Sequence, residues 1–261
     1  MIYTSGPLTW GRFRIRDFHN YGAALSSTDV IVKSSNIGTA RIALQLGGAR
    51  QRDFLGELGF LEATPVEMIE APSGAPLLPR NWSEISTMTI SYGHGLSTSP
   101  LHLATGYASL LNGGTKVEPT LLRQHHPQNG ERIVSAQTSR VAREMLRAVV
   151  ERGTASFGEV PGYEVGGKTG TADKPRENGG GYYDDKVIST FASVFPADNP
   201  RYVLIVTLDE PSENSGAKPR RTAGWTAVPV AAEMIRRVAP LLGLRPEIET
   251  LQPVGVTLTS N

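Results

Sequence analysis

The stretch Gly-Gly-Lys-Thr-Gly-Thr-Ala-Asp at residues 166–173 sets Lys168 and two threonine hydroxyls between glycines. Glycines allow a ligand to approach the backbone closely, while the ammonium and hydroxyl groups supply charge and hydrogen bonds. Such a stretch is suited to holding an anion. Two interpretations of it predict two different enzymes.

The first interpretation is the phosphate loop of a P-loop NTPase, because residues 162–169 fit the pattern G-x-x-x-x-G-K-[ST]. Residues 203–210 also resemble an apolar strand that ends in an acidic pair suited to magnesium. A phosphate loop needs a helix directly after it, because the helix N-terminus binds the phosphates. The proline- and glycine-rich residues after the motif leave no room for a helix before Val187, which disfavours this interpretation.

The second interpretation places Lys168 on a β-strand. Residues 163–173 form a β-like run in which the two threonines share one face. Two further strands are predicted at residues 187–195 and 202–208, and the turn signal at residues 198–200 separates them. The three strands predict an antiparallel meander in which the lysine lines a cleft.

Helices precede the predicted sheet. A short helix capped by Ser26 or Ser27 runs to Lys33, and a second helix that includes Ile37 ends at the glycine pair 47–48. The remaining predictions are helices at residues 54–60, 99–111, 135–153 and 228–242, an edge strand or extended arm at 12–16, a small hairpin of 117–123 with 132–134, and irregular structure from 63 up to 88–90. The last helix can pack back on the sheet, and this order indicates the α+β class.

Composition excludes several classes of function. A chain of 261 residues is long enough for a substantial core, in one domain or two closely packed lobes. The formal net charge of +1 gives no electrostatic case for nucleic acid or a membrane surface. Without cysteine the chain has no disulfide, thiol nucleophile or thiolate metal ligand. We predict no metal and no other cofactor, since ligand spacing and carboxylate neighbours are lacking around His94, His102, His125 and His126.

Ser34 and Asn36 lie in the tight break between the first two predicted helices, where side chains point out of the element and not into a core. Taken alone, both would be helix-capping residues, and an isolated strand lysine such as Lys168 would be a solvated charge. Together, a serine, an asparagine and a lysine can pass protons and hold a substrate that has both an amide and a carboxylate.

Two segments that carry these residues resemble motifs of a known family. Residues 33–36, Lys-Ser-Ser-Asn, match the S-x-N motif, and residues 168–171, Lys-Thr-Gly-Thr, match the K-T-G-T motif of penicillin-binding proteins and serine β-lactamases. Residues 82–85 and 91–96 resemble further segments of division-specific class B penicillin-binding proteins of the FtsI type, and the resemblance covers about residues 8–242 in the family's order. The chain thus resembles the C-terminal part of that family's transpeptidase domain.

The resemblance implies the penicillin-binding protein and serine β-lactamase-like transpeptidase fold, an antiparallel sheet flanked by helices. It implies a partial transpeptidase domain at residues 1–250, with a helical lobe at about 20–155, a sheet lobe at about 160–245, and a C-terminal tail at 251–261.

The family's nucleophile is the serine of an S-x-x-K motif upstream of S-x-N, and no such motif precedes Ser34. The S-x-x-K match at Ser215 lies after K-T-G in a loop rich in proline and arginine, and we take it as coincidental. We therefore expect a fragment that lacks the early strands, the nucleophile helix and a membrane anchor. Such a fragment is expected to be inactive alone and poorly soluble, because its sheet edge is exposed.

By resemblance, the parent enzyme is a peptidoglycan D,D-transpeptidase that crosslinks stem peptides through an acyl-enzyme during septal cell-wall synthesis, and it is the target of β-lactams. Ser34 then relays a proton near the leaving group, Asn36 holds the substrate amide, and Lys168 keeps the cleft positive. The hydroxyls of Thr169 and Thr171 bind the terminal carboxylate. The Thr171 N–H forms half of the oxyanion hole, and Gly170 leaves space for substrate against the strand.

The resemblance also implies partners and a location. Expected partners are stem peptides ending in D-Ala-D-Ala, β-lactams, and membrane proteins of the division complex. The expected location is the periplasmic face of the bacterial inner membrane, reached through an anchor outside this chain. The alternative functions are a serine β-lactamase or a D,D-carboxypeptidase, a non-catalytic penicillin-fold binding module and, most distantly, the P-loop NTPase.

Overall fold

The computed structural model describes residues 1–126, 130–177 and 181–247. The tail expected at residues 251–261 and most of the glycine run at 179–181 lie outside the described residues. The helices are α1 (Ser27–Val32), α2 (Asn36–Leu46), α3 (Gly48–Glu57), α4 (Glu84–Ser91), α5 (Pro100–Leu111), α6 (Ala136–Arg152) and α7 (Ala227–Val238), with 3-10 turns η1 (Ala71–Gly74) and η2 (Ser156–Gly158). The strands are β1 (Ile2–Tyr3), β2 (Leu8–Trp10), β3 (Phe13–Ile15), β4 (Ala24–Leu25), β5 (Gly166–Pro175), β6 (Tyr182–Phe195) and β7 (Tyr202–Asp209).

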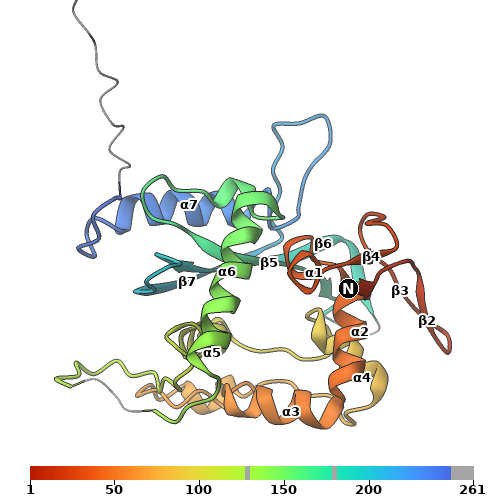
Figure 1. The fold of residues 1–261 in the computed structure, drawn as a ribbon, viewed down its shortest axis with the longest axis horizontal. Coiled ribbons are helices and arrows are strands. Elements are labelled where there is room, and N and C mark those ends of the chain that lie inside the picture. Colours follow the sequence, from red (N-terminus) through yellow and green to blue (C-terminus); the bar gives the residue numbers. More distant parts are fainter. Residues whose placement is uncertain (127–129, 178–180, 248–261) are drawn as a thin grey trace, which may run out of the picture.

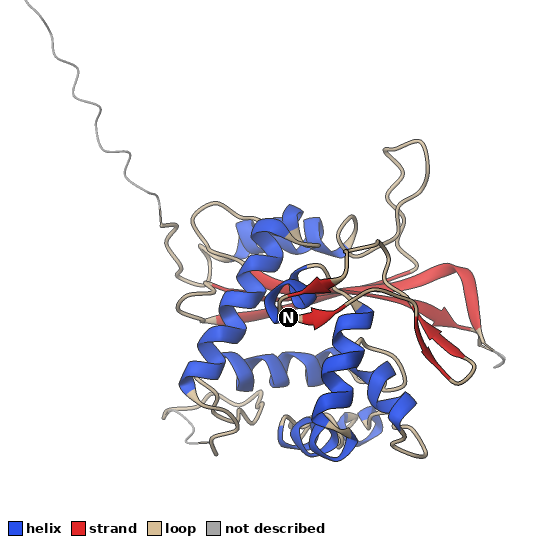
Figure 2. Ribbon diagram, turned by 45° about the vertical axis from the view of Figure 1, so that its right-hand side comes forward, coloured by secondary structure: helices blue, strands red, loops and turns tan. Residues whose placement is uncertain are grey.

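The predicted antiparallel meander is confirmed. Its strands pair in the order β5-β6-β7, and the register sets Thr169 opposite Phe191 and Thr171 opposite Ser189. Figure 2 shows helices on both sides of this sheet. Helix α7 packs against β6 and β7, α5 packs against the same two strands, and α6 packs against β5. These contacts form the α+β architecture expected from the sequence.

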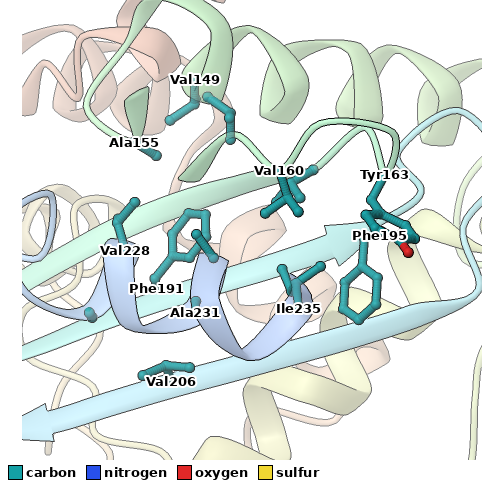
Figure 3. Close-up of a cluster of buried hydrophobic side chains, with 14 of the residues drawn as sticks. Val149, Ala155, Val160, Tyr163, Phe191, Phe195, Val206, Val228, Ala231 and Ile235 are labelled. Atoms are coloured by element: carbon teal, nitrogen blue, oxygen red, sulfur yellow. The ribbon is translucent and has the colours of Figure 1, made fainter. Parts of the chain in front are cut away.

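Alternation along β6 divides its side chains between the two faces of the sheet. Phe191 and Phe195 join the main core cluster with buried residues of α7, whereas Val194 packs with Leu111 of α5 in a separate cluster. Figure 3 shows Phe191 between the strands and α7, whose Val228, Ala231 and Ile235 line the same core. Strand residues at a spacing of two and helix residues at a spacing of three and four therefore meet across one interface.

Serine side chains cap the N-termini of five helices. The hydroxyls of Ser26, Ser35, Ser83, Ser99 and Ser135 each accept a backbone N–H in the first turn of α1, α2, α4, α5 and α6. Each such cap contributes about 1 kcal/mol to stability. In α5 the buried His102 completes the cap through Nδ1, and its Nε2 lies 2.7 Å from the Glu62 carbonyl oxygen. His102 therefore serves the packing of α5.

The structure corrects three predictions. The expected hairpin of residues 117–123 with 132–134 is wrong, since the described residues of this region form no strand and contain only an isolated bridge between Thr115 and Arg132. Residues 84–91 form α4, although they were expected to be irregular, because packing of the fully buried Met88 near α2 outweighs the low helix propensity of neighbouring β-branched residues. The P-loop interpretation also fails, because the described residues after Lys168 continue as strand β5 and not as a helix.

Candidate active site

The break between α1 and α2 places Ser34 in a strained conformation. Ser34 N–H donates to Ile31 O and Ser35 N–H donates to Val30 O, so α1 ends in a Schellman motif with Ser34 at its left-handed position. Ser34 has a φ of 57°, a region usually occupied by glycine in this motif. A serine at a position that favours glycine indicates that its hydroxyl has a function.

We predict that Ser34→Gly gives a more stable fold than Ser34→Ala, since both variants lack the hydroxyl that accepts from Lys168 and only alanine retains the strained left-handed backbone. The difference in the free energy of unfolding should be about 0.5–1 kcal/mol, because relief of the strain is partly offset by the greater chain entropy of glycine. Urea denaturation of the Ser34→Gly and Ser34→Ala variants checks this. An alanine variant as stable as the glycine variant would show that the left-handed backbone carries no cost.

The start of α2 presents Asn36 beside this serine. Asn36 is the first residue of the helix, and its Nδ2 donates to Arg16 O at 3.1 Å, which leaves the second amide hydrogen and the oxygen for other partners. Asp17 fixes the same helix start: its carboxylate accepts the Ser35 hydroxyl at 2.7 Å and the Ile37 N–H at 2.9 Å. The loop that carries Arg16 and Asp17 thus orients the segment from Ser34 to Asn36.

Strand β5 brings Lys168 to this break. Lys168 Nζ donates to Ser34 Oγ at 2.7 Å and to Thr169 O at 3.0 Å, across 134 residues of sequence in the first case. Figure 1 shows the short helix α1 beside the sheet that contains β5. The pairing register places Lys168 and Gly170 on the face of β5 opposite to Thr169 and Thr171. The lysine therefore reaches the serine from one face, while the threonine hydroxyls lie on the other.

Burial lowers the pKa of Lys168 from its ordinary value of 10.5 to about 8. Desolvation disfavours the charged ammonium, and the contact with the neutral Ser34 hydroxyl supplies no counter-charge. Between pH 8 and 10.5 the unfolded chain binds this proton more tightly than the folded chain. The contribution of Lys168 to stability is consequently least favourable below pH 8 and improves as the pH rises through this window.

We expect one lysine of this chain to titrate near pH 8. NMR of the ¹³C-methylated lysines should show a resonance with that midpoint, and the resonance should be absent from the Lys168→Arg variant. A spectrum in which every lysine titrates above pH 10 would contradict the burial of the Lys168 ammonium.

The two threonine hydroxyls lie in a recess of about 360 Å³ that Ser34 and Asn36 also line. Thr169 Oγ1 lies 2.6 Å from Thr154 Oγ1, and Thr171 Oγ1 accepts the Ala223 N–H at 3.0 Å. Both hydroxyls are thus held by segments outside β5. Two such hydroxyls, with the Lys168 ammonium on the opposite face of the same strand, form a donor set suited to a carboxylate.

The glycines of β5 have different roles. A side chain at Gly167 would lie 2.6 Å from the ring of Phe191, so this glycine makes room for the core. A side chain at Gly170 would meet only the Thr190 carbonyl oxygen, at 3.9 Å. Packing within the chain therefore does not require Gly170, which is exposed at the strand surface beside Lys168.

Known proteins of one family resemble this chain over most of its length. The family described as the penicillin binding protein transpeptidase domain matches residues 2–231. The chain belongs to this family. A Caulobacter vibrioides protein named probable peptidoglycan D,D-transpeptidase FtsI is 38% identical over 253 residues, which cover 93% of this chain and 42% of that protein. PbpB of Mycobacterium tuberculosis is 32% identical, over 91% of this chain and 38% of its own length.

Solved transpeptidase structures share the fold. The transpeptidase domain of penicillin-binding protein 3 from Burkholderia pseudomallei has a TM-score of 0.83 and 31% identity, over 95% of this chain and 73% of that one. Penicillin-binding protein 3 of M. tuberculosis in complex with aztreonam has a TM-score of 0.80 and 31% identity, over 95% of this chain and 58% of that one. The expected penicillin-binding protein fold is confirmed, and the chain spans about two fifths of the length of its curated relatives.

The chain brings together the site residues predicted from sequence. Ser34 contacts Lys168, and Asn36, Thr169 and Thr171 share the recess with Ser34. Ser215, in contrast, is exposed in a loop closed by a bridge between Glu213 and Arg220, away from any helix start. Its isolation agrees with a coincidental S-x-x-K match.

Three residues near the site were missed. Asp17, Thr154 and Ala223 contact the motif residues from distant points of the sequence, and nothing in their own spacing indicated this. The loop rich in proline and arginine after β7 leads into the backbone that holds Thr171. Separately, no helix in the described ranges of the chain combines the length and the apolarity that crossing a bilayer requires.

Proposed function

We propose that this chain supplies the S-x-N and K-T-G parts of a D,D-transpeptidase site that crosslinks peptidoglycan stem peptides. The observation that carries the proposal is the contact of 2.7 Å between Lys168 Nζ and Ser34 Oγ, beside a recess lined by Thr169 and Thr171. This contact joins the two motifs of the family within one site. The names of relatives from Caulobacter and Neisseria, which include peptidoglycan D,D-transpeptidase, support the same activity.

The residues take their roles from charge and position. The Thr169 and Thr171 hydroxyls bind the C-terminal carboxylate of a D-Ala-D-Ala peptide, and Lys168 adds positive charge nearby. Asn36 donates its remaining amide hydrogen to the substrate backbone. Ser34, polarised by Lys168, passes a proton to the leaving nitrogen. The Thr171 N–H stabilises the oxyanion, and Gly170 lets the peptide lie against β5.

The reaction needs a serine nucleophile from an S-x-x-K segment, which we place in the polypeptide upstream of this chain. Its oxygen bonds to the carbonyl carbon of the penultimate D-alanine, the C–N bond breaks, and D-alanine leaves with the proton delivered through Ser34. An amine of a second stem peptide then displaces the serine and forms the crosslink. A cavity of about 480 Å³ is lined by Lys168, Tyr107 and Leu103 among others. It supports a nucleophile and substrate beside Lys168, because it provides space there.

β-Lactams would react at the same site up to the acyl stage. The M. tuberculosis structures with aztreonam and ampicillin support this ligand class. We further propose that the whole protein works at the periplasmic face of the inner membrane, in contact with membrane proteins of the division complex. The FtsI name of the Caulobacter relative supports this setting.

The test supplies an acyl-D-Ala-D-Ala peptide and an amine acceptor to a longer polypeptide that carries S-x-x-K upstream of this chain. We expect release of D-alanine and a crosslinked product by mass spectrometry, both blocked by penicillin. Hydrolysed peptide without crosslinks would instead indicate a D,D-carboxypeptidase, and turnover of penicillin would indicate a β-lactamase. No reaction with either ligand would favour a non-catalytic binding module and overturn the proposal.

A further inference from the structure

Parts of the site that are distant in sequence meet at the turn of Gly153 and Thr154, directly after α6. A side chain on Gly153 would lie 2.5 Å from the carbonyl oxygen of Val32, the last residue of α1. A side chain on Gly224 would lie 2.7 Å from the Thr154 carbonyl oxygen. The turn therefore lies against both the C-terminal end of α1, which precedes Ser34, and the loop that holds Thr171.

Thr154 also reaches β5 through its side chain. Its Oγ1 lies 2.6 Å from Thr169 Oγ1, and Thr154 lines the same recess as Ser34 and Thr169. A hydroxyl has one hydrogen to donate and two lone pairs that accept. When Thr154 donates to Thr169, the Thr169 hydrogen is left to point into the recess.

The neighbouring threonine is arranged in the same way. Thr171 Oγ1 accepts the Ala223 N–H at 3.0 Å, so its own hydrogen is also left for another acceptor. Thr169 and Thr171 thus each have a group from outside β5 beside the hydroxyl oxygen, and this group can fix the orientation of the hydroxyl. Two hydroxyls held as donors match the two oxygens of a carboxylate, and donors fixed before binding lose less entropy when the ligand arrives.

We propose that Thr154 is a positioning residue of the carboxylate site. Its hydroxyl donates to Thr169 Oγ1 and so directs the Thr169 hydrogen to the carboxylate of a D-Ala-D-Ala peptide or a β-lactam. The inference rests on the proposed function. The competing explanation is that the Thr154–Thr169 contact only ties α6 to the sheet.

The test measures acylation of the longer polypeptide by benzylpenicillin and by its methyl ester, which has no carboxylate. We expect Thr154→Val to lower the acylation rate constant about tenfold for benzylpenicillin, in line with one lost hydrogen bond to a charged group. The constant for the ester should change less than twofold, and Thr154→Ser should restore the benzylpenicillin value. The ratio of the two constants comes from one preparation and does not depend on the folded fraction.

Thr138→Val is the matched control, because Thr138 and Ser135 form a similar hydroxyl pair, 2.9 Å apart, at the opposite, exposed end of α6. It should change neither constant. An equal fall for both ligands with Thr154→Val, or no fall, would overturn the positioning role while leaving the proposed function intact. An unaltered protein that neither ligand acylates would overturn the proposed function and this inference with it.

Discussion

Lys168→Ala should abolish acylation by penicillin, with a fall in the rate constant of about 100- to 1,000-fold, the range seen when one group that stabilises developing charge is removed. The substitution removes the positive charge that lines the neighbouring cavity of about 480 Å³ and the donor that polarises Ser34 at 2.7 Å. Stopped-flow competition with a fluorescent penicillin, on the longer polypeptide, measures the constant.

Lys174→Ala is the control on the same strand. Lys174 Nζ pairs with Asp209 and Glu210 near the far end of β5, and partly exposed ion pairs contribute little to stability. Its acylation constant should match that of the unaltered protein. Equal losses in the two lysine variants would indicate a general effect of positive charge on the strand and would contradict a specific role for Lys168.

Phe191→Ala should cost about 3–5 kcal/mol of folding free energy, the usual effect of removing a buried phenylalanine from a core. Phe191 is fully buried among α7, Val206 and the backbone of Gly167. Gly167 has no side chain and therefore leaves space for the phenylalanine ring. Since a domain has about 5–15 kcal/mol of stability in total, a large share would be lost. Urea unfolding followed by tryptophan fluorescence measures the change.

The exposed Phe18 offers a matched control. Its ring is 81% exposed, so Phe18→Ala should change stability by no more than about 0.5 kcal/mol. A Phe191→Ala variant that unfolds within 1 kcal/mol of the unaltered protein would show that the sheet and α7 do not share the core described above.

Local signals predicted the elements that position the site. The strand predicted at residues 187–195 corresponds to β6, and Ser99 followed by proline marks the start of α5. Ser34, Asn36 and Lys168 were predicted from two short motifs, because these motifs follow one another along the chain in the same order as in the family. Each of these signals lies within a few neighbouring residues, and backbone geometry converts such spacing directly into a shared face or a cap.

The parts that could not be predicted depend on contacts between distant segments. Asp17 is an ordinary acidic residue in the sequence, and only the fold brings it to the start of α2. Thr154 looks like a residue of a helix-ending turn until β5 is placed against it. Helix α4 was missed for a related reason, since Met88 gains its burial from tertiary packing and not from local propensity.

Labelling with a fluorescent penicillin tests most directly whether Lys168, Ser34 and the threonines form one half of a penicillin-reactive site. We predict that the longer polypeptide with S-x-x-K is labelled, that Lys168→Ala removes the label, and that residues 1–261 alone are not labelled. Labelling of residues 1–261 alone would contradict this, because the nucleophile would then lie within this chain, with Ser34 and Ser215 the first serines to replace.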